Sequence, residues 1–74
     1  MRVLLLKNVE EFTSEEFDMS KKEFGILKRH IGHVAEAVEA VSGEEWDYTY
    51  FDITFPDNVE VRAISGYHLK KLKG

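Results

Sequence analysis

A long apolar repeat runs through the middle of the sequence and gives the first expectation for the fold. Its members follow one another at spacings of three and four residues: Phe24, Leu27, Ile31, Val34, Val38 and Val41. These spacings form one continuous stripe on an α-helix, so the repeat predicts a helix over residues 21–41. Ser20 and Glu23 form a capping-box pattern at its start, and Gly43 suits the left-handed position after its end.

Two glycines interrupt this repeat. Gly25 and Gly32 each lower helix stability by up to about 1 kcal/mol relative to alanine. They either allow another backbone to approach closely or mark a bend, and the sequence does not decide between these. The spacing also fits a two-helix coiled coil, but packing on the protein's own sheet is favoured because the chain has good strand signals.

Three other segments have strand patterns. Residues 3–6 are apolar at four consecutive positions, which is typical of a short strand buried on both faces. Residues 46–55 alternate, with Phe51, Ile53 and Phe55 on one face. Residues 56–58 predict a turn that returns the chain through residues 59–65. The expected fold is α+β in the order β-α-β-β, one long helix packed on a small three-stranded sheet.

The remaining segments give weaker signals. Residues 8–20 read as a loop with one helical turn, in which Thr13 and Glu16 fit a second capping box. The tail from Tyr67 onwards is amphipathic but short. A helical turn, an added strand and a frayed end are all compatible with it.

The length of the chain indicates a single domain over residues 1–74. A chain of 74 residues without cysteine is too short for two cores and has no disulfide. Its core supplies only about 3–5 kcal/mol, so we expect added stability from a second copy, as a homodimer, or from a partner. No segment approaches the roughly 20 apolar residues that span a bilayer, and the N-terminus lacks a secretory pattern. We therefore expect a cytoplasmic protein that does not bind membranes.

An aromatic face suggests where two copies meet. Trp46, Tyr48 and Tyr50 share the strand face opposite Phe51, and a contiguous exposed aromatic patch is typical of an interface. We therefore predict these three residues as the dimer interface. The alternative is that the tail or the loop with Phe12 and Phe17 covers this face within one chain.

The sequence gives little support for catalysis. It has no cysteine and no glycine-rich phosphate loop, and its serines lie in cap or turn contexts. His30, His33 and Glu36 offer at most two well-placed metal ligands on a helix. His68 lies in the basic tail, where we expect it to be solvated. We expect no enzyme, no catalytic residue, no cofactor and no metal.

Charge is distributed unevenly along the chain, whose net charge is −4. Residues 36–60 contain no lysine or arginine and eight carboxylates: Glu36, Glu39, Glu44, Glu45, Asp47, Asp52, Asp57 and Glu60. In the predicted helix, Glu36 and Glu39 would also approach the negative C-terminus, which is unfavourable. Helix stability therefore does not explain their position. They either keep an acidic face soluble or bind a partner.

The partner reading is phosphate mimicry. Helix neighbours such as Glu36 and Glu39 would lie about 5–6 Å apart, similar to phosphates along a nucleic-acid strand. A row of carboxylates at such spacing would attract the basic DNA-binding surface of another protein. The eight carboxylates are therefore the predicted partner-binding residues, with Trp46 and Tyr48 as added apolar anchors.

In this character the chain resembles the small acidic DNA-mimic proteins that bacteriophages use in host takeover. The resemblance covers the general composition and the carboxylates of residues 36–47. It implies a non-enzymatic inhibitor that occupies the DNA-binding surface of a bacterial nucleoid protein such as HU. A homodimeric structural or regulatory interaction module is the alternative. Direct nucleic-acid binding through Lys21, Lys22, Lys28, Arg29, His30 and the tail is disfavoured, because nearby carboxylates repel phosphate.

Overall fold

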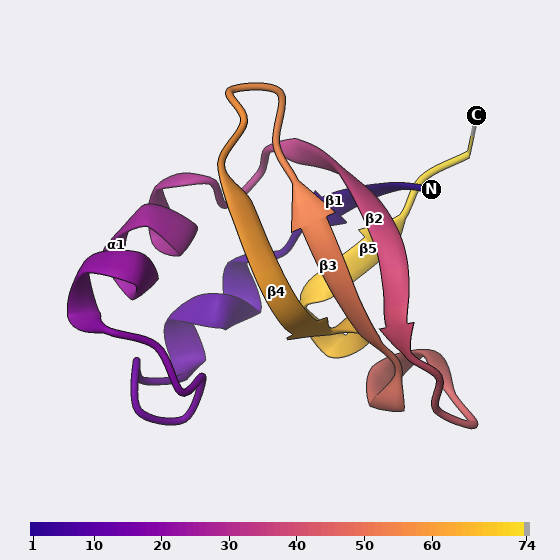
Figure 1. Ribbon diagram of the computed structural model, residues 1–74, viewed down its shortest axis with the longest axis horizontal. Coiled ribbons are helices and arrows are strands. Elements are labelled where there is room, and N and C mark those ends of the chain that lie inside the picture. Colours follow the sequence, from indigo (N-terminus) through magenta and orange to yellow (C-terminus); the bar gives the residue numbers. More distant parts are fainter. Residues whose placement is uncertain (74) are drawn as a thin grey trace.

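Five antiparallel strands form one sheet in the order β4-β3-β2-β1-β5 in the computed structural model, which describes residues 1–73 (Figure 1). The strands are β1 (Arg2–Leu5), β2 (Val34–Val41), β3 (Tyr50–Thr54), β4 (Glu60–Ser65) and β5 (Leu69–Lys71). One α-helix and three 3-10 helices connect them: η1 (Lys7–Glu11), α1 (Lys21–Arg29), η2 (Trp46–Tyr48) and η3 (Gly66–His68).

The predicted helix over residues 21–41 is wrong beyond Arg29. α1 has 9 residues, and Gly32 follows it with a φ of 84°, a left-handed conformation that ends the helix. Val34–Val41 instead forms β2, which pairs with β1 on one side and with β3 on the other. The segment alternates buried Ala35 and Ala37 with exposed residues, a strand period that the valine spacing obscured.

The expected α+β fold, one long helix on a three-stranded sheet, is therefore incorrect. The chain is mostly β, with a single short helix and a five-stranded sheet. Among the three alternatives for the tail, an added strand is the observed one, because β5 pairs with β1. The order β-α-β-β failed because it counted β2 as helix and missed β5.

Several local predictions are confirmed. The N-terminal strand is present at residues 2–5, although only one of its faces is fully buried, and Phe51, Ile53 and Phe55 are all buried. The chain turns after Phe55 and returns as β4. The capping box is present, since Ser20 Oγ accepts from the Glu23 amide at 3.1 Å and the Glu23 carboxylate accepts from the Ser20 amide at 3.1 Å.

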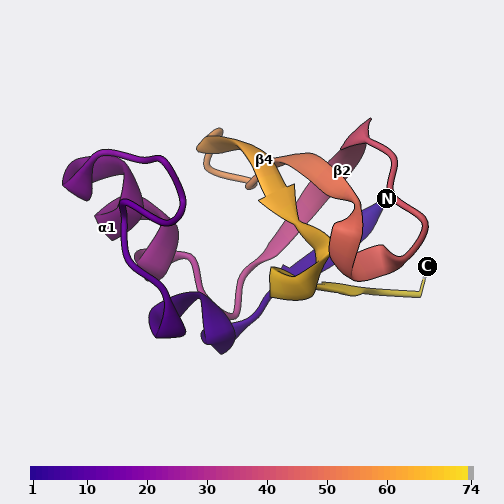
Figure 2. The same cartoon turned by 90° about the horizontal axis from the view of Figure 1, so that it is seen from below.

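The sheet buries one face and exposes the other. The buried face carries most of the core: Val3, Leu5, Ala35, Ala37, Phe51, Ile53, Val61, Ile64 and Leu69. Phe24 and Leu27 of α1 join this core. Seen from below, α1 lies beyond the β4 edge and does not cover the sheet (Figure 2). α1 thus lies next to β4, and no helix of residues 1–73 lies over the outer face of β2, β3 and β4 (Figures 1 and 2).

Candidate functional site

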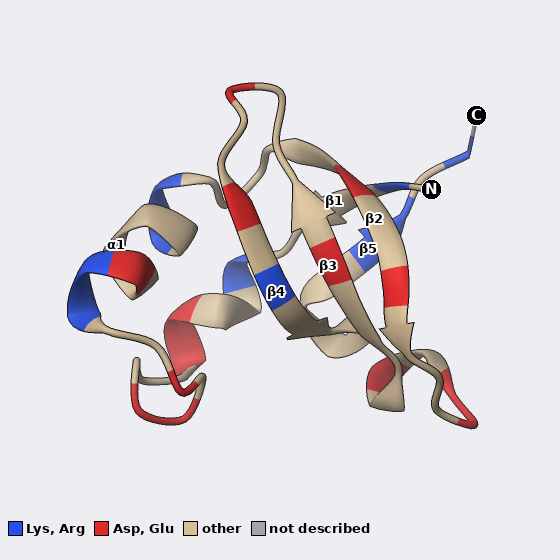
Figure 3. Cartoon of the chain, in the orientation of Figure 1, with Lys and Arg blue, Asp and Glu red and all other residues tan. Residues whose placement is uncertain are grey.

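The outer face of the sheet brings three of the predicted carboxylates together. In the strand register Glu36 lies opposite Thr54, Thr54 lies opposite Glu60, and Asp52 lies opposite Val38. Asp52 is thus diagonal to both Glu36 and Glu60, and diagonal positions on neighbouring strands are about 7–8 Å apart between their α-carbons. The red bands across β2, β3 and β4 follow this arrangement (Figure 3). We call Glu36, Asp52 and Glu60 the acidic face.

The other five carboxylates lie elsewhere. Glu39 is three residues from Glu36 on a strand, so the two point to opposite faces and are not the helix neighbours that the repeat predicted. Glu44 and Glu45 lie between β2 and η2, and Asp47 lies in η2. These residues gather at one end of the sheet, whereas Asp57 lies in the β3–β4 turn at the other end (Figure 3).

Few of these carboxylates have a cationic partner. The N-terminal amine lies 3.9 Å from Glu36, His30 Nε2 lies 2.7 Å from Asp57, and Arg62 Nε lies 3.1 Å from Glu60. Among residues 1–73 the remaining five form no ion pair within 4.0 Å: Glu39, Glu44, Glu45, Asp47 and Asp52. Asp52 accepts a hydrogen bond from the Ala63 amide at 3.0 Å.

Apart from Arg62 on β4, which pairs with Glu60, most basic residues occupy other parts of the fold. Lys70, Lys71 and Lys73 lie in β5 and just after it, and further lysines lie at the two ends of α1 (Figure 3). On the outer face Arg2 lies opposite Glu36, and Lys70 lies opposite Leu4. The charge of this face therefore changes from acidic over β2, β3 and β4 to basic over β1 and β5.

The three residues of the predicted aromatic interface do not share one strand face. Trp46 and Tyr48 lie in η2 and not in a strand, and the Trp46 ring packs 4.8 Å from Phe51. Trp46 Nε1 donates to the Leu69 carbonyl at 2.9 Å. Only Tyr50 lies on the sheet, 42% exposed and opposite Val41. The strand prediction failed here because η2 turns Trp46 into the core.

A different apolar group is exposed on the outer face. Val38 is 70% exposed and Val41 is 59% exposed, next to Tyr50, and Tyr48 is 67% exposed in η2. The helical repeat placed both valines in a buried stripe. The strand period of residues 34–41 was the signal that could have found them.

His30 attaches α1 to the β3–β4 turn. Its Nδ1 lies 2.8 Å from the Ile26 carbonyl and its Nε2 lies 2.7 Å from the Asp57 carboxylate. Because both ring nitrogens face acceptors, the protonated ring is favoured. The Ile26 carbonyl is the main cause of a raised pKa for His30, and the hydrogen bond with His30 lowers the pKa of Asp57.

His68 is buried, so the prediction that it is solvated is wrong. Its ring packs against Phe12 at 5.1 Å and Phe17 at 4.9 Å. The His68 Nδ1 atom lies 2.9 Å from Asn8 Oδ1. The side-chain nitrogen of Asn8 donates to the Tyr67 carbonyl. Burial lowers the pKa of His68, which favours the neutral ring.

The described part of the chain contains neither a grouped set of metal ligands nor a membrane-spanning helix. Within residues 1–73, no three or more histidine, cysteine, aspartate or glutamate side chains are grouped so that they could hold a metal ion. In the same part of the chain, no helix has both the length and the apolar character needed to cross a membrane.

Comparison of the chain with protein-family models, with curated proteins and with solved structures finds no match.

Proposed function

We propose that the protein is a non-enzymatic binding module that presents carboxylates to the basic DNA-binding surface of another protein. The observation that carries this proposal is the separation of charge. The carboxylates of the acidic face and of the η2 end lie on the outer face and at one end of the sheet, where Arg62 pairs with Glu60. The lysines lie at the β5 edge, in η1 and in α1. A surface that normally binds phosphates would find a similar negative potential here.

The spacing of the acidic face supports the same proposal. The carboxylates are carried by strand positions about 7–8 Å apart. This separation is similar to that of successive phosphates along a nucleic-acid backbone. A β-sheet holds them in a fixed geometry, so little conformational entropy is lost on binding. Such preorganised carboxylates would compete with DNA more effectively than carboxylates on a flexible tail.

Exposed apolar side chains next to the carboxylates would add protein-specific contacts. Val38 lies directly opposite Asp52, and Val41 lies directly opposite Tyr50. DNA has no equivalent of these groups, so a protein target could be bound more tightly than by charge alone. The partner that fits best is an HU-like nucleoid protein in the cytoplasm of a bacterial host.

A competition experiment tests this proposal. A purified HU-like protein is bound to labelled duplex DNA. The 74-residue protein, without a label, is then added as competitor at 50 mM and at 200 mM salt. We expect the protein to displace the DNA, and its affinity to fall by at least about tenfold between the two salt concentrations, as expected for an interaction based on released counterions.

Charge reversals provide the matched control. Glu36→Lys combined with Glu45→Lys should abolish displacement. Glu10→Lys combined with Glu15→Lys changes the net charge by the same amount on exposed residues outside the acidic face, and should leave displacement unchanged. If both double variants displace DNA as well as the unchanged protein, or if the unchanged protein does not displace it, the proposal is wrong.

One observation favours a second candidate, a homodimeric interaction module. Val38, Val41 and Tyr50 give the outer face an apolar area that a second copy could cover, with Tyr48 nearby. Sedimentation velocity distinguishes the two candidates. A dimer that persists in high salt and dissociates on Val41→Lys supports the module, and a salt-independent monomer excludes it.

A further inference from the structure

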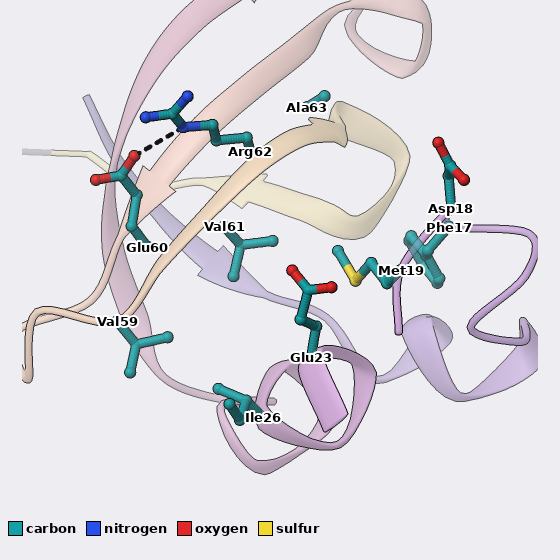
Figure 4. Close-up of a pocket in the computed structure, with 10 residues that line it drawn as sticks. All are labelled: Phe17, Asp18, Met19, Glu23, Ile26, Val59, Glu60, Val61, Arg62 and Ala63. Carbon is teal, nitrogen blue, oxygen red and sulfur yellow. Dashed lines mark hydrogen bonds and ion pairs between the residues drawn. The ribbon is translucent and has the colours of Figure 1, made fainter. Parts of the chain in front are cut away.

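A groove runs between α1 and the free edge of β4 (Figure 4). Its volume is about 530 Å³, within the roughly 300–1,000 Å³ of typical ligand pockets. Apolar side chains line it from both sides: Phe17, Met19, Ile26, Val59 and Val61. α1 and β4 are far apart in the sequence, so only the folded chain creates this groove.

The backbone of β4 is available on the side of the groove. Val59 directs its carbonyl to β3, where it accepts from the Phe55 amide at 2.8 Å, and the Ala63 amide donates to Asp52. Because successive residues of a strand alternate, Glu60 and Arg62 direct their amides and carbonyls away from β3. The sheet ends at β4, and the backbone groups of these two residues form no backbone hydrogen bond outside the strand ladder within residues 1–73.

The charge of the groove is negative. Asp18, Glu23 and Glu60 line it together with a single cation, Arg62, which is already paired with Glu60 at 3.1 Å. Asp18 forms no ion pair in the described part of the chain. The Glu23 carboxylate accepts from Ser20, and these hydrogen bonds lower the pKa of Glu23, so it is ionised near neutral pH. An occupant with positive charge would be attracted.

We infer that this groove binds an extended segment of a partner protein, in which apolar residues alternate with lysine or arginine, as an added strand next to β4. The free backbone groups of Glu60 and Arg62 would supply main-chain hydrogen bonds, which is how strand addition gains affinity. Apolar side chains level with Val61 would enter the groove beside Met19 and Ile26. This inference does not depend on the proposed function, and the two surfaces share only Glu60.

A second copy of the chain is a less suitable occupant. α1 lies beside the β4 edge in both views, so a second complete sheet continued past β4 would meet α1 (Figures 1 and 2). A single extended segment needs only about 4.8 Å beyond β4, the spacing of neighbouring strands. The geometry therefore favours a peptide segment over a dimer.

The test uses the full chain, labelled with nitrogen-15, and a blocked heptapeptide that alternates valine and lysine. We expect saturable binding, with shifts and slower hydrogen exchange of the Glu60 and Arg62 amides. A peptide with glutamate in place of lysine, and one methylated on the amides that face β4, should each bind at least about tenfold more weakly. Absence of saturable binding, or equal binding of all three peptides, overturns the inference.

A protein variant gives a second test. Ile26→Asn should weaken the valine–lysine peptide at least about tenfold, whereas Val38→Asn, a matched change on the outer face, should not. The peptide variants keep the test valid if Ile26→Asn does not fold. Slower exchange at Glu60 and Arg62 that depends on protein concentration, without peptide, would identify a second copy as the occupant and overturn the inference.

Discussion

The two edges of the sheet differ in how their backbone is satisfied. At the β5 edge, the Leu69 carbonyl accepts from Trp46 Nε1 at 2.9 Å, and the Leu69 amide donates to the Gly66 carbonyl. Lys70 and Lys71 add charge to the same edge. At the β4 edge, Glu60 and Arg62 have no such partners among residues 1–73, and the groove lies next to them.

This difference indicates which edge is protected and which is available. Exposed strand edges tend to associate, and lysine side chains or covering groups prevent this. β5 has covering groups at Leu69 and lysine side chains at Lys70 and Lys71, and no covering hydrogen bond is present at Lys71 within residues 1–73. β4 has the pair Glu60 and Arg62 and a bulge at Ala63, but its backbone stays open on the side of α1. The backbone groups of β4 are therefore the ones available to the partner segment inferred above.

The largest expected effect concerns the packing that protects β5. A Cβ added to Gly66 would lie 2.1 Å from the Trp46 carbonyl oxygen, which the backbone cannot accommodate without moving. Gly66→Ala should therefore lower the free energy of unfolding by about 3 kcal/mol, measured by urea denaturation. Gly25→Ala is the control, because nothing lies within 4 Å of its added Cβ and alanine favours a helix. Equal effects of the two changes would contradict this account of η2 packing.

The next effect concerns the hydrogen bond at the β5 edge. Trp46→Phe keeps an aromatic ring next to Phe51 but removes the donor to Leu69. We expect it to lower the free energy of unfolding by about 1–2 kcal/mol and to leave an open carbonyl on β5. Tyr48→Phe, a change at an exposed aromatic residue of η2, should alter stability by less than about 0.5 kcal/mol. If Trp46→Phe leaves the free energy of unfolding unchanged, the indole does not protect this edge.

A smaller effect is expected from pH, with opposite signs near the two edges. The pKa of His30, beside the β3–β4 turn, is raised, so its stabilisation is complete below 6.5 and is lost as pH rises through the raised value. The pKa of His68, beside β5, is lowered, so its stabilisation is complete above 6.5 and is lost as pH falls towards the lowered value.

Single variants separate the two histidines. The comparison is the change in melting temperature on acidification from pH 7.5 to pH 5.5. This change should be more positive for His68→Gln than for the unchanged protein, because only the His30 contribution remains. His30→Gln should lose thermal stability over the same interval. Melting temperatures at both pH values check this prediction, and the same sign for both variants would contradict the two pKa directions.

The smallest effect concerns the bulge of β4. Ala63 has a φ of 57°, which is unfavourable for a residue with a side chain. Ala63→Gly should raise the free energy of unfolding by up to about 1 kcal/mol, measured by denaturation. Ala40→Gly in β2, where φ is not positive, should lower it by about 0.5–1 kcal/mol. Destabilisation by both changes would show that the bulge is not strained.

The sequence predicted the parts of the fold that depend on local patterns. The capping box of Ser20 and Glu23, the buried positions of β3 and the turn after Phe55 follow from neighbouring residues. Residues 34–41 satisfied a helical and a strand period at once. The strand prevailed because β1 and β3 supply hydrogen bonds on both sides, which no local pattern shows.

The candidate sites were less predictable. The carboxylates of residues 36–60 were evident from composition, but which of them share a face depends on strand register, as Glu36 and Glu39 show. Trp46 looked like a strand residue until η2 turned it towards Leu69. The groove could not be anticipated, because its walls come from residues 17–26 and 59–63, and their proximity is a property of the folded chain.

Amide hydrogen exchange of the free protein tests the contrast between the two edges most directly. The amides of Glu60 and Arg62 should exchange at least about a hundredfold faster than the amide of Leu69, at every protein concentration. Similar protection at the three amides, or protection of Glu60 and Arg62 that grows with concentration, would contradict an open β4 edge and a closed β5 edge.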